Sequence, residues 1–106
     1  MASRLAVTAR FDVIPGQEAA FMKEMRKQAE NSLSLEPDCH YFDICVDVDN
    51  PGRILLYELY EDAASFDEHL ASRHFAEFSQ GPRHCVVRRS KVTSSHCHSS
   101  EPIGPT

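Results

Sequence analysis

Residues 53–78, RILLYELYEDAASFDEHLASRHFAEF, join a strand to a helix through a short acidic connection. Successive side chains of a strand alternate between its two faces, so Leu56, Glu58 and Tyr60 are expected to share one face of residues 53–60. Asp62 then suits the N-cap of a helix, because its side chain can accept an orphan backbone N–H. A strand that passes directly into a helix fits a domain that combines sheet and helices.

The helix after Asp62 has an apolar stripe at helical spacing, formed by Phe66, His69 and Leu70. Ser72 resembles a second N-cap, so we expect a break there. A further helical segment would then point Phe75 and Phe78 inward, and Gly81-Pro82 would end it.

A β-hairpin is predicted just before this unit. Residues 39–48 alternate between apolar and polar side chains, with Phe42 on the apolar side. Residues 49–52, DNPG, suit a tight turn, because proline presets its own φ and glycine tolerates a positive φ. Residues 39–48 are therefore expected to pair with residues 53–60.

The outer parts of the chain complete the pattern. Residues 5–13 alternate as a first strand, Pro15-Gly16 opens a helix, and residues 84–92 suit a last strand. The helix has an inward stripe of Phe21, Met22, Met25, Ala29 and Ser32 or Leu33. The order β-α-β-β-α-β predicts an α+β, ferredoxin-like domain over residues 1–93, with a four-stranded antiparallel sheet. Residues 94–106 are polar and are expected to be a flexible tail.

Length and charge limit the classes of function. A chain of 106 residues fits one domain, and its net charge of -5 with scattered basic residues argues against nucleic-acid binding. No apolar run approaches the roughly 20 residues of a membrane span, and no signal sequence is recognised. We therefore expect a cytoplasmic protein that does not bind membranes and whose four cysteines are reduced.

The predicted arrangement leaves one face of the sheet without helices. This face would carry Ala6, Thr8, Tyr41 and Cys45, which together are too apolar to remain in water. The sheet of a second subunit would cover it, so we expect a homodimer.

His69 and Glu58 are the candidate catalytic residues. A carboxylate in an apolar strand is costly to bury without a partner. If Glu58 faces the following helix, it could pair with His69, fix its tautomer and raise its basicity. Such a pair could take a proton from a phenol, an enol or a hydroxyketone. The alternative is that His69 is a hydrogen-bonded core residue and that Glu58 faces solvent.

Other chemistry-bearing residues are less informative. His74 could line the mouth of a pocket or lie on the surface. His96, Cys97 and His98 could capture a soft metal, but zinc needs about four ligands and no second pair lies nearby. The sequence has no nucleophile elbow, phosphate loop or dinucleotide fingerprint. We therefore expect neither a cofactor nor a metal.

Residues 57–78 resemble the antibiotic biosynthesis monooxygenase (ABM) family, and the likeness extends over about residues 5–92. The family pattern has Tyr-Glu in a strand, then a tyrosine, an acidic helix start, an aromatic residue and His-x-x-Ser-x-His-Phe. This pattern is present as Tyr57, Glu58, Tyr60, Asp62, Phe66, His69, Ser72, His74 and Phe75.

The resemblance implies a dimeric α+β barrel with a pocket between sheet and helices. The chain resembles the quinol-monooxygenase type, and members of the family include monooxygenases that oxidise quinols or polyketide phenols with O2 and without metal or flavin. By that likeness His69 would take a proton from a small organic substrate and Glu58 would orient the histidine. The walls of the pocket would be Phe42, Tyr60, Phe66, His74 and Phe75.

Besides the monooxygenase, an isomerase and a non-catalytic binding protein are alternative functions, and haem degradation is a third activity to consider. An isomerase of a small hydroxyketone, such as a phosphorylated sugar, would also use a pocket base. A non-catalytic dimer that binds a small molecule is the third reading. Haem-degrading members use a pocket tryptophan and a ligating histidine. This chain has no tryptophan and has Phe78-Ser79 where the ligand would be, which argues against haem.

Overall fold

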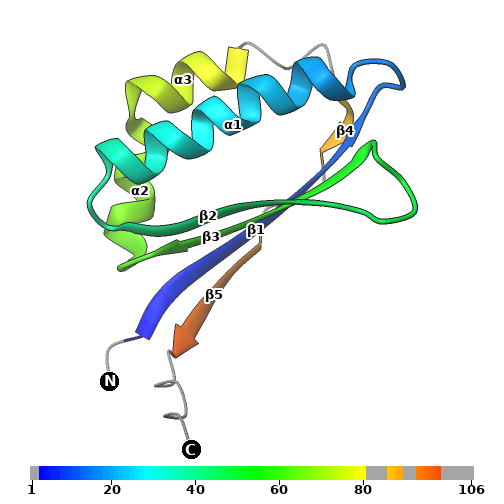
Figure 1. Ribbon diagram of the computed structural model, residues 1–106. Helices are drawn as coiled ribbons and strands as arrows, with labels where there is room; N and C mark the ends of the chain where they lie inside the picture. The colour runs from blue at the N-terminus through cyan, green and yellow to red at the C-terminus, as the bar shows by residue number, and fades with distance from the viewer. Residues whose placement is uncertain (1–2, 81–85, 90–92, 99–106) are drawn as a thin grey trace, which may run out of the picture.

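The computed structural model describes residues 3–80, 86–89 and 93–98 (Figure 1). The elements follow in the order β1 (Ser3–Val13), α1 (Glu18–Leu35), β2 (Cys39–Val46), β3 (Arg53–Tyr60), α2 (Ala63–Ala71), α3 (Arg73–Gln80), β4 (Val86–Arg89) and β5 (Thr93–His98). The predicted α+β, ferredoxin-like order is confirmed. Its second helix is split into α2 and α3, and a fifth strand is added.

One antiparallel sheet has the strand order β2-β3-β1-β4, with β5 also paired to β1. Strand β1 is central: residues 5–12 pair with β3 on one edge. Its other edge is shared, because β4 pairs with residues 11–13 and β5 with residues 3–8. The N-terminal and C-terminal parts of the chain therefore meet on the same strand.

The prediction of a flexible tail from residue 94 is wrong for residues 94–98, which belong to β5. The edge of β1 explains the strand. Strand β4 has only four residues and covers one end of the eleven-residue β1. Backbone N–H and C=O groups left on such an edge need partners, and a polar segment can supply them through its own backbone. The predicted Gly81-Pro82 helix end lies outside the described residues.

Helices cover one face of the sheet (Figure 1). Helix α1 begins after Gly16, whose positive φ of 92° suits a glycine, and its buried side is formed by Phe21, Met25, Gln28, Ala29 and Ser32. Leu33 is 46% exposed, so of the two alternatives predicted for the end of the stripe, Ser32 is the inward one. Phe21 and Met25 pack on β1 and β3 side chains such as Phe11 and Tyr60 in a single core.

The predicted hairpin is confirmed, although β2 ends at Val46 rather than at residue 48. The Asn50 side chain accepts the backbone N–H of Gly52 at 3.0 Å and stabilises the turn. A register shift between Cys39 and Tyr41 brings Cys39 and Phe42 onto the core side, although three positions separate them.

The face of the sheet away from the helices carries large exposed side chains. Tyr41 is paired with Leu59, and Cys45 is paired with Leu55 across β2 and β3. Tyr41 is 54% exposed and Leu55 is 45% exposed. Cys45 is also exposed. The apolar outer face that the sequence predicts is therefore present.

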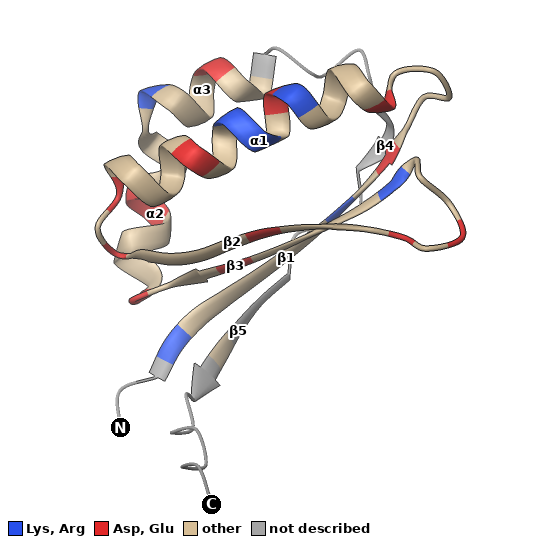
Figure 2. Ribbon diagram, in the orientation of Figure 1, with Lys and Arg blue, Asp and Glu red and all other residues tan. Residues whose placement is uncertain are grey.

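Charges of both signs are mixed over the molecule. Figure 2 shows basic and acidic positions interspersed along α1, with acidic positions also at the hairpin turn and near α2. Among the described residues, no helix has the length and apolar character to cross a membrane.

Candidate active site

Two caps place the helices that carry the site. Asp62 accepts the backbone N–H of Ser65 at 2.8 Å and its hydroxyl at 2.7 Å, and these hydrogen bonds lower the pKa of Asp62. Ser72 accepts the backbone N–H of Phe75 at 3.2 Å and donates to the carbonyl oxygen of His69 at 2.7 Å. Both predicted caps are confirmed, and the break at Ser72 sets the angle between α2 and α3.

His69 projects from α2 into an aromatic surrounding and is only 2% exposed. Its ring stacks on Phe66, with centroids 6.1 Å apart and planes 14° from parallel. Further rings lie around it at centroid distances of 5.2 to 6.3 Å, namely Phe42, Tyr60, His74 and Phe75. This packing leaves the imidazole few alternative orientations.

The carboxylate that holds His69 is Glu36. The Nδ1 atom of His69 lies 2.8 Å from Oε2 and 3.1 Å from Oε1 of Glu36. Glu36 is the residue that ends α1, and Pro37 after it favours the extended backbone that Glu36 adopts, with φ of -116° and ψ of 100°. Glu36, and not Glu58 as predicted from the sequence, is therefore the carboxylate at hydrogen-bonding distance from His69.

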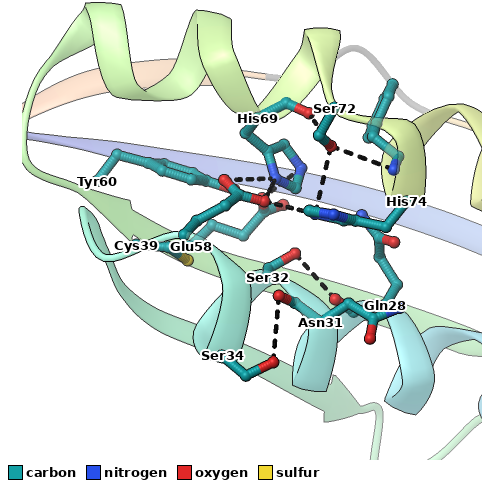
Figure 3. A network of polar contacts seen from close by, with 12 residues as sticks. Gln28, Asn31, Ser32, Ser34, Cys39, Glu58, Tyr60, His69, Ser72 and His74 are labelled. Atoms are coloured by element: carbon teal, nitrogen blue, oxygen red, sulfur yellow. Dashed lines mark hydrogen bonds and ion pairs between the residues drawn. The ribbon is translucent and has the colours of Figure 1, made fainter.

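Glu58 faces the same cavity as His69, but it does not form the expected direct hydrogen bond. Its Oε1 atom lies 3.9 Å from Nε2 of His69, a distance of ion pairs rather than hydrogen bonds. The same Oε1 accepts the hydroxyl of Tyr60 at 2.6 Å. His69 is thus flanked by Glu36 in contact with Nδ1 and by Glu58 near Nε2. Figure 3 shows Glu58 and Tyr60 beside the imidazole of His69.

Burial sets the protonation of this cluster. It lowers the pKa of His69, although the hydrogen bond to Glu36 acts in the opposite direction. Burial, followed by the negative charge of Glu58, raises the pKa of Tyr60. At neutral pH His69 is therefore uncharged and able to accept a proton, while Tyr60 stays protonated and donates a hydrogen bond to Glu58.

His74 also binds Glu36. Its Nε2 atom lies 2.5 Å from Oε2 of Glu36, and its side chain is 11% exposed. Glu36 therefore connects the buried imidazole of α2 with one from α3 that lies nearer the surface. His74 borders a small hollow of about 110 Å³ together with exposed residues of α1 and α3.

A cavity of about 280 Å³ lies between the sheet and the helices. Its apolar lining consists of Val7, Ala9, Phe11, Met25, Phe42, Leu56, Phe66, Leu70, Phe75 and Phe78. Its polar lining consists of Gln28, Glu58 and His69. An apolar cavity with a few converging polar groups is typical of a small-molecule site.

Three of the five predicted pocket residues, Phe42, Phe66 and Phe75, line the cavity. The other two do not. Tyr60 is fully buried and contacts Glu58, Phe66 and His69 from behind, and His74 borders the smaller hollow instead.

Three side chains of the site could also hold a cation. In the described part of the chain, Glu36, His69 and His74 each offer one ligand atom, and these atoms lie within 4.8 Å of one another. Two histidines and one carboxylate are a ligand set used by zinc and by non-haem iron. A bound cation would replace the protons that now link Glu36 to both imidazoles.

The cysteines that the structure describes do not supply a nucleophile to this site. Cys39 and Cys45 are free, and burial, followed by the charge of Glu36, raises the pKa of Cys39 to about 12. A thiol with so high a pKa remains protonated at neutral pH and is unreactive.

Sequence reasoning missed Glu36 and Gln28. A carboxylate directly before a proline at the end of a helix is the only local signal for Glu36, since its partners are 33 and 38 positions away. Gln28 lies one position before Ala29, which does belong to the predicted stripe. A polar residue beside such a stripe is a weak sign of burial.

Comparison with known proteins defines the class. The sequence profile described as antibiotic biosynthesis monooxygenase matches residues 4–81. The chain therefore belongs to the antibiotic biosynthesis monooxygenase family, as the sequence analysis expected. Membership supports a general monooxygenase-like role. No curated protein matches the sequence.

Solved structures agree on the fold. A conserved protein from Methanosarcina mazei has a TM-score of 0.84 and 23% identity, over 92% of this chain and 95% of that one. A protein from Pseudomonas aeruginosa has a TM-score of 0.83 and 23% identity, over 93% and 98%. A structure described as an antibiotic biosynthesis monooxygenase has a TM-score of 0.76 and 24% identity, over 92% and 99%. At this identity the likeness shows the fold.

Proposed function

We propose that the protein is a monooxygenase that oxidises a small hydroquinone or related phenol in the 280 Å³ cavity, with His69 as the general base. The observation that carries the proposal is the setting of His69. Its Nδ1 atom is held by Glu36, which leaves Nε2 as the basic atom beside the cavity.

The chemistry follows from this arrangement. His69 takes a hydroxyl proton of the substrate on Nε2, and the electron-rich anion then reduces O2. One oxygen atom of O2 is inserted into a ring C–H bond, and the hydroquinone becomes a hydroxyquinone. The other oxygen atom leaves as water, together with the two hydrogens of the original hydroxyl groups. The substrate supplies all the electrons, so this reaction needs no separate reductant.

The flanking carboxylates favour the first step. When Nε2 accepts a proton, the imidazole becomes positively charged between Glu36 and Glu58. Both carboxylates stabilise that charge in a region with little water. His74 also hydrogen-bonds to Glu36 and helps to keep this carboxylate ionised beside the imidazolium.

We also propose that the protein acts as a homodimer. The outer face of the sheet carries Tyr41 and Leu55, both about half exposed. A second sheet laid on this face would bury them and would give the dimeric barrel that family membership implies.

The test of the function is oxygen uptake with 1,4-dihydroxynaphthalene, measured above the uncatalysed rate. We expect uptake by the wild type, one labelled oxygen atom in the product from ¹⁸O2, and loss of uptake in His69→Ala. The variant His40→Ala is the control, since His40 pairs with Glu61 and does not line the cavity.

Other outcomes assign other roles. Turnover of an α-hydroxyketone without oxygen uptake would indicate an isomerase, and ligand binding without turnover would indicate a binding protein. Dialysis against a chelator tests whether the activity depends on a metal ion bound by Glu36, His69 and His74. The proposal predicts an unchanged rate, whereas loss of activity restored by one metal would assign Glu36, His69 and His74 to that metal.

A further inference from the structure

Gln28 is a buried polar residue without an evident structural role for its side-chain amide. The residue is 3% exposed on the inner side of α1. Among the described residues, its Nε2 atom is the buried side-chain nitrogen or oxygen that has no hydrogen-bond partner. Leaving a buried donor unpaired destabilises a protein, so such a donor suggests that a ligand supplies the missing acceptor.

The position of Gln28 supports this reading. It lines the same cavity as His69 and Glu58, and each of the three comes from a different element. The rest of the cavity lining is apolar. Among the side chains of the described lining, these three are therefore the ones that can hydrogen-bond to a polar atom of a bound substrate.

The three polar groups differ in what they offer. Glu58 is a carboxylate and accepts hydrogen bonds, and Nε2 of His69 accepts when Nδ1 carries the proton. Gln28 offers N–H groups. The described lining thus presents acceptors near His69 and a side-chain donor at Gln28.

We propose that Gln28 donates a hydrogen bond to a second oxygen atom of the substrate, while His69 removes a proton from the first. This inference rests on the proposed function and narrows its substrate class. The preferred substrates are arenes with two oxygen atoms on a conjugated ring system, such as hydroquinones, rather than monophenols. The cavity volume of about 280 Å³ suits molecules of one or two rings.

Conjugation gives this contact a role in the reaction as well. After His69 removes a proton, negative charge develops over the ring and on the oxygen atoms attached to it. A fixed N–H donor at the second oxygen is then more strongly bound than in the neutral substrate. Gln28 is therefore expected to affect both KM and kcat.

Anaerobic calorimetric titration with 1,4-dihydroxynaphthalene and 1-naphthol tests the proposal on the full chain. We expect the wild type to bind the diol about five- to tenfold more tightly, the range of one additional hydrogen bond. Gln28→Met, similar in size and without the donor, should bind both compounds equally. Lys23→Met is the control, because Lys23 is exposed on the same helix and does not line the cavity. An unchanged preference in Gln28→Met would overturn the inference.

The melting temperature provides a second, ligand-free test. Because Gln28→Met removes an unpaired buried donor, we expect a melting temperature equal to or a few degrees above that of the wild type. A fall of several degrees would assign Gln28 a structural role and would also overturn the inference.

Failure of this inference differs from failure of the proposed function. If oxygen uptake depends on His69 but the preference for the diol is the same in Gln28→Met, the function stands and the role of Gln28 is wrong. If the preference depends on Gln28 but no hydroquinone supports oxygen uptake, the binding role stands and the oxygenase function is wrong.

Discussion

His69 combines deep burial with a fixed orientation. Burial lowers its pKa, and the Glu36 carboxylate partly offsets that effect by favouring the protonated form. The balance keeps the imidazole neutral at neutral pH, with Nε2 unprotonated. A base in this state accepts a proton without first having to lose one.

The pH dependence of oxygen uptake follows from that shift. A general base works only when it is unprotonated, so kcat/KM should fall as the pH drops through the pKa of His69. Because that pKa is lowered from its ordinary 6.5, the acidic limb of the profile should lie below pH 6.5. A limb above pH 6.5 would contradict the assignment of His69 as the buried base.

Substitutions of the two carboxylates separate their roles. We expect Glu36→Gln to lower kcat/KM about 100-fold, because the anion that fixes the tautomer is lost. Glu58→Gln should lower it about tenfold, since Glu58 acts on the charge of His69 only from 3.9 Å. Glu61→Gln, a surface carboxylate beside His40, is the control. The reverse order of effects would return the orienting role to Glu58.

At the level of residues, the sequence located His69 and its aromatic neighbour Phe66, but not the carboxylate that hydrogen-bonds to His69. His69 and Phe66 could be placed because helical spacing puts both on one apolar stripe. Glu36 could not, because its contact with His69 depends on how the end of α1 meets α2 in three dimensions. Its place before Pro37 at the end of a helix is a weak local signal, because solvated carboxylates also occur at such positions.

At the level of elements, Ser72 links the two short helices. It ends the hydrogen bonding of α2 through the carbonyl oxygen of His69 and starts α3 through the backbone N–H of Phe75. This one residue therefore sets the positions from which both histidines reach Glu36.

Removing this cap should be measurable in a stability experiment. Ser72→Ala is expected to lower the free energy of unfolding in urea by about 1 kcal/mol, the usual effect of losing an N-cap. Ser34→Ala should change it by less than about 0.5 kcal/mol, because Ser34 is exposed and bonds only to α1 carbonyl oxygens. Equal effects of the two substitutions would show that Ser72 does not act as a cap.

The order of the elements up to β4 was predicted from the sequence, whereas strand β5 near the C-terminal end was not. Alternation and turn residues located β1, β2 and β3, since each has a buried face that imposes the pattern. Residues 93–98, TSSHCH, carry no such pattern, although they pair with β1 through the backbone. A strand of this kind cannot be predicted from the alternation of apolar and polar side chains.

At the scale of the whole molecule, the sheet separates two environments. Its inner face holds the core, the cavity and the site, and none of the helices that the structure describes covers its outer face (Figure 1). The sequence predicted this asymmetry, because the order β-α-β-β-α-β places both helical segments on one face of the sheet.

Light scattering can test the proposed dimer. We expect the wild type at about twice 12.0 kDa and Leu55→Asp at 12.0 kDa, because a charge on the outer face cannot be buried without a partner. Val48→Asp should remain dimeric, since Val48 is 97% exposed beside the hairpin turn. A monomeric wild type would contradict the proposal.

The protonation of His69 can be observed without knowledge of the substrate. A long-range ¹H–¹⁵N spectrum of the protein at pH 7 distinguishes the two neutral tautomers from the imidazolium by the shifts of both ring nitrogens. We predict that Nδ1 carries the proton toward Glu36 and that Nε2 is unprotonated and available to the substrate. A proton on Nε2, in either the other tautomer or the imidazolium, would contradict the assignment of His69 as the base.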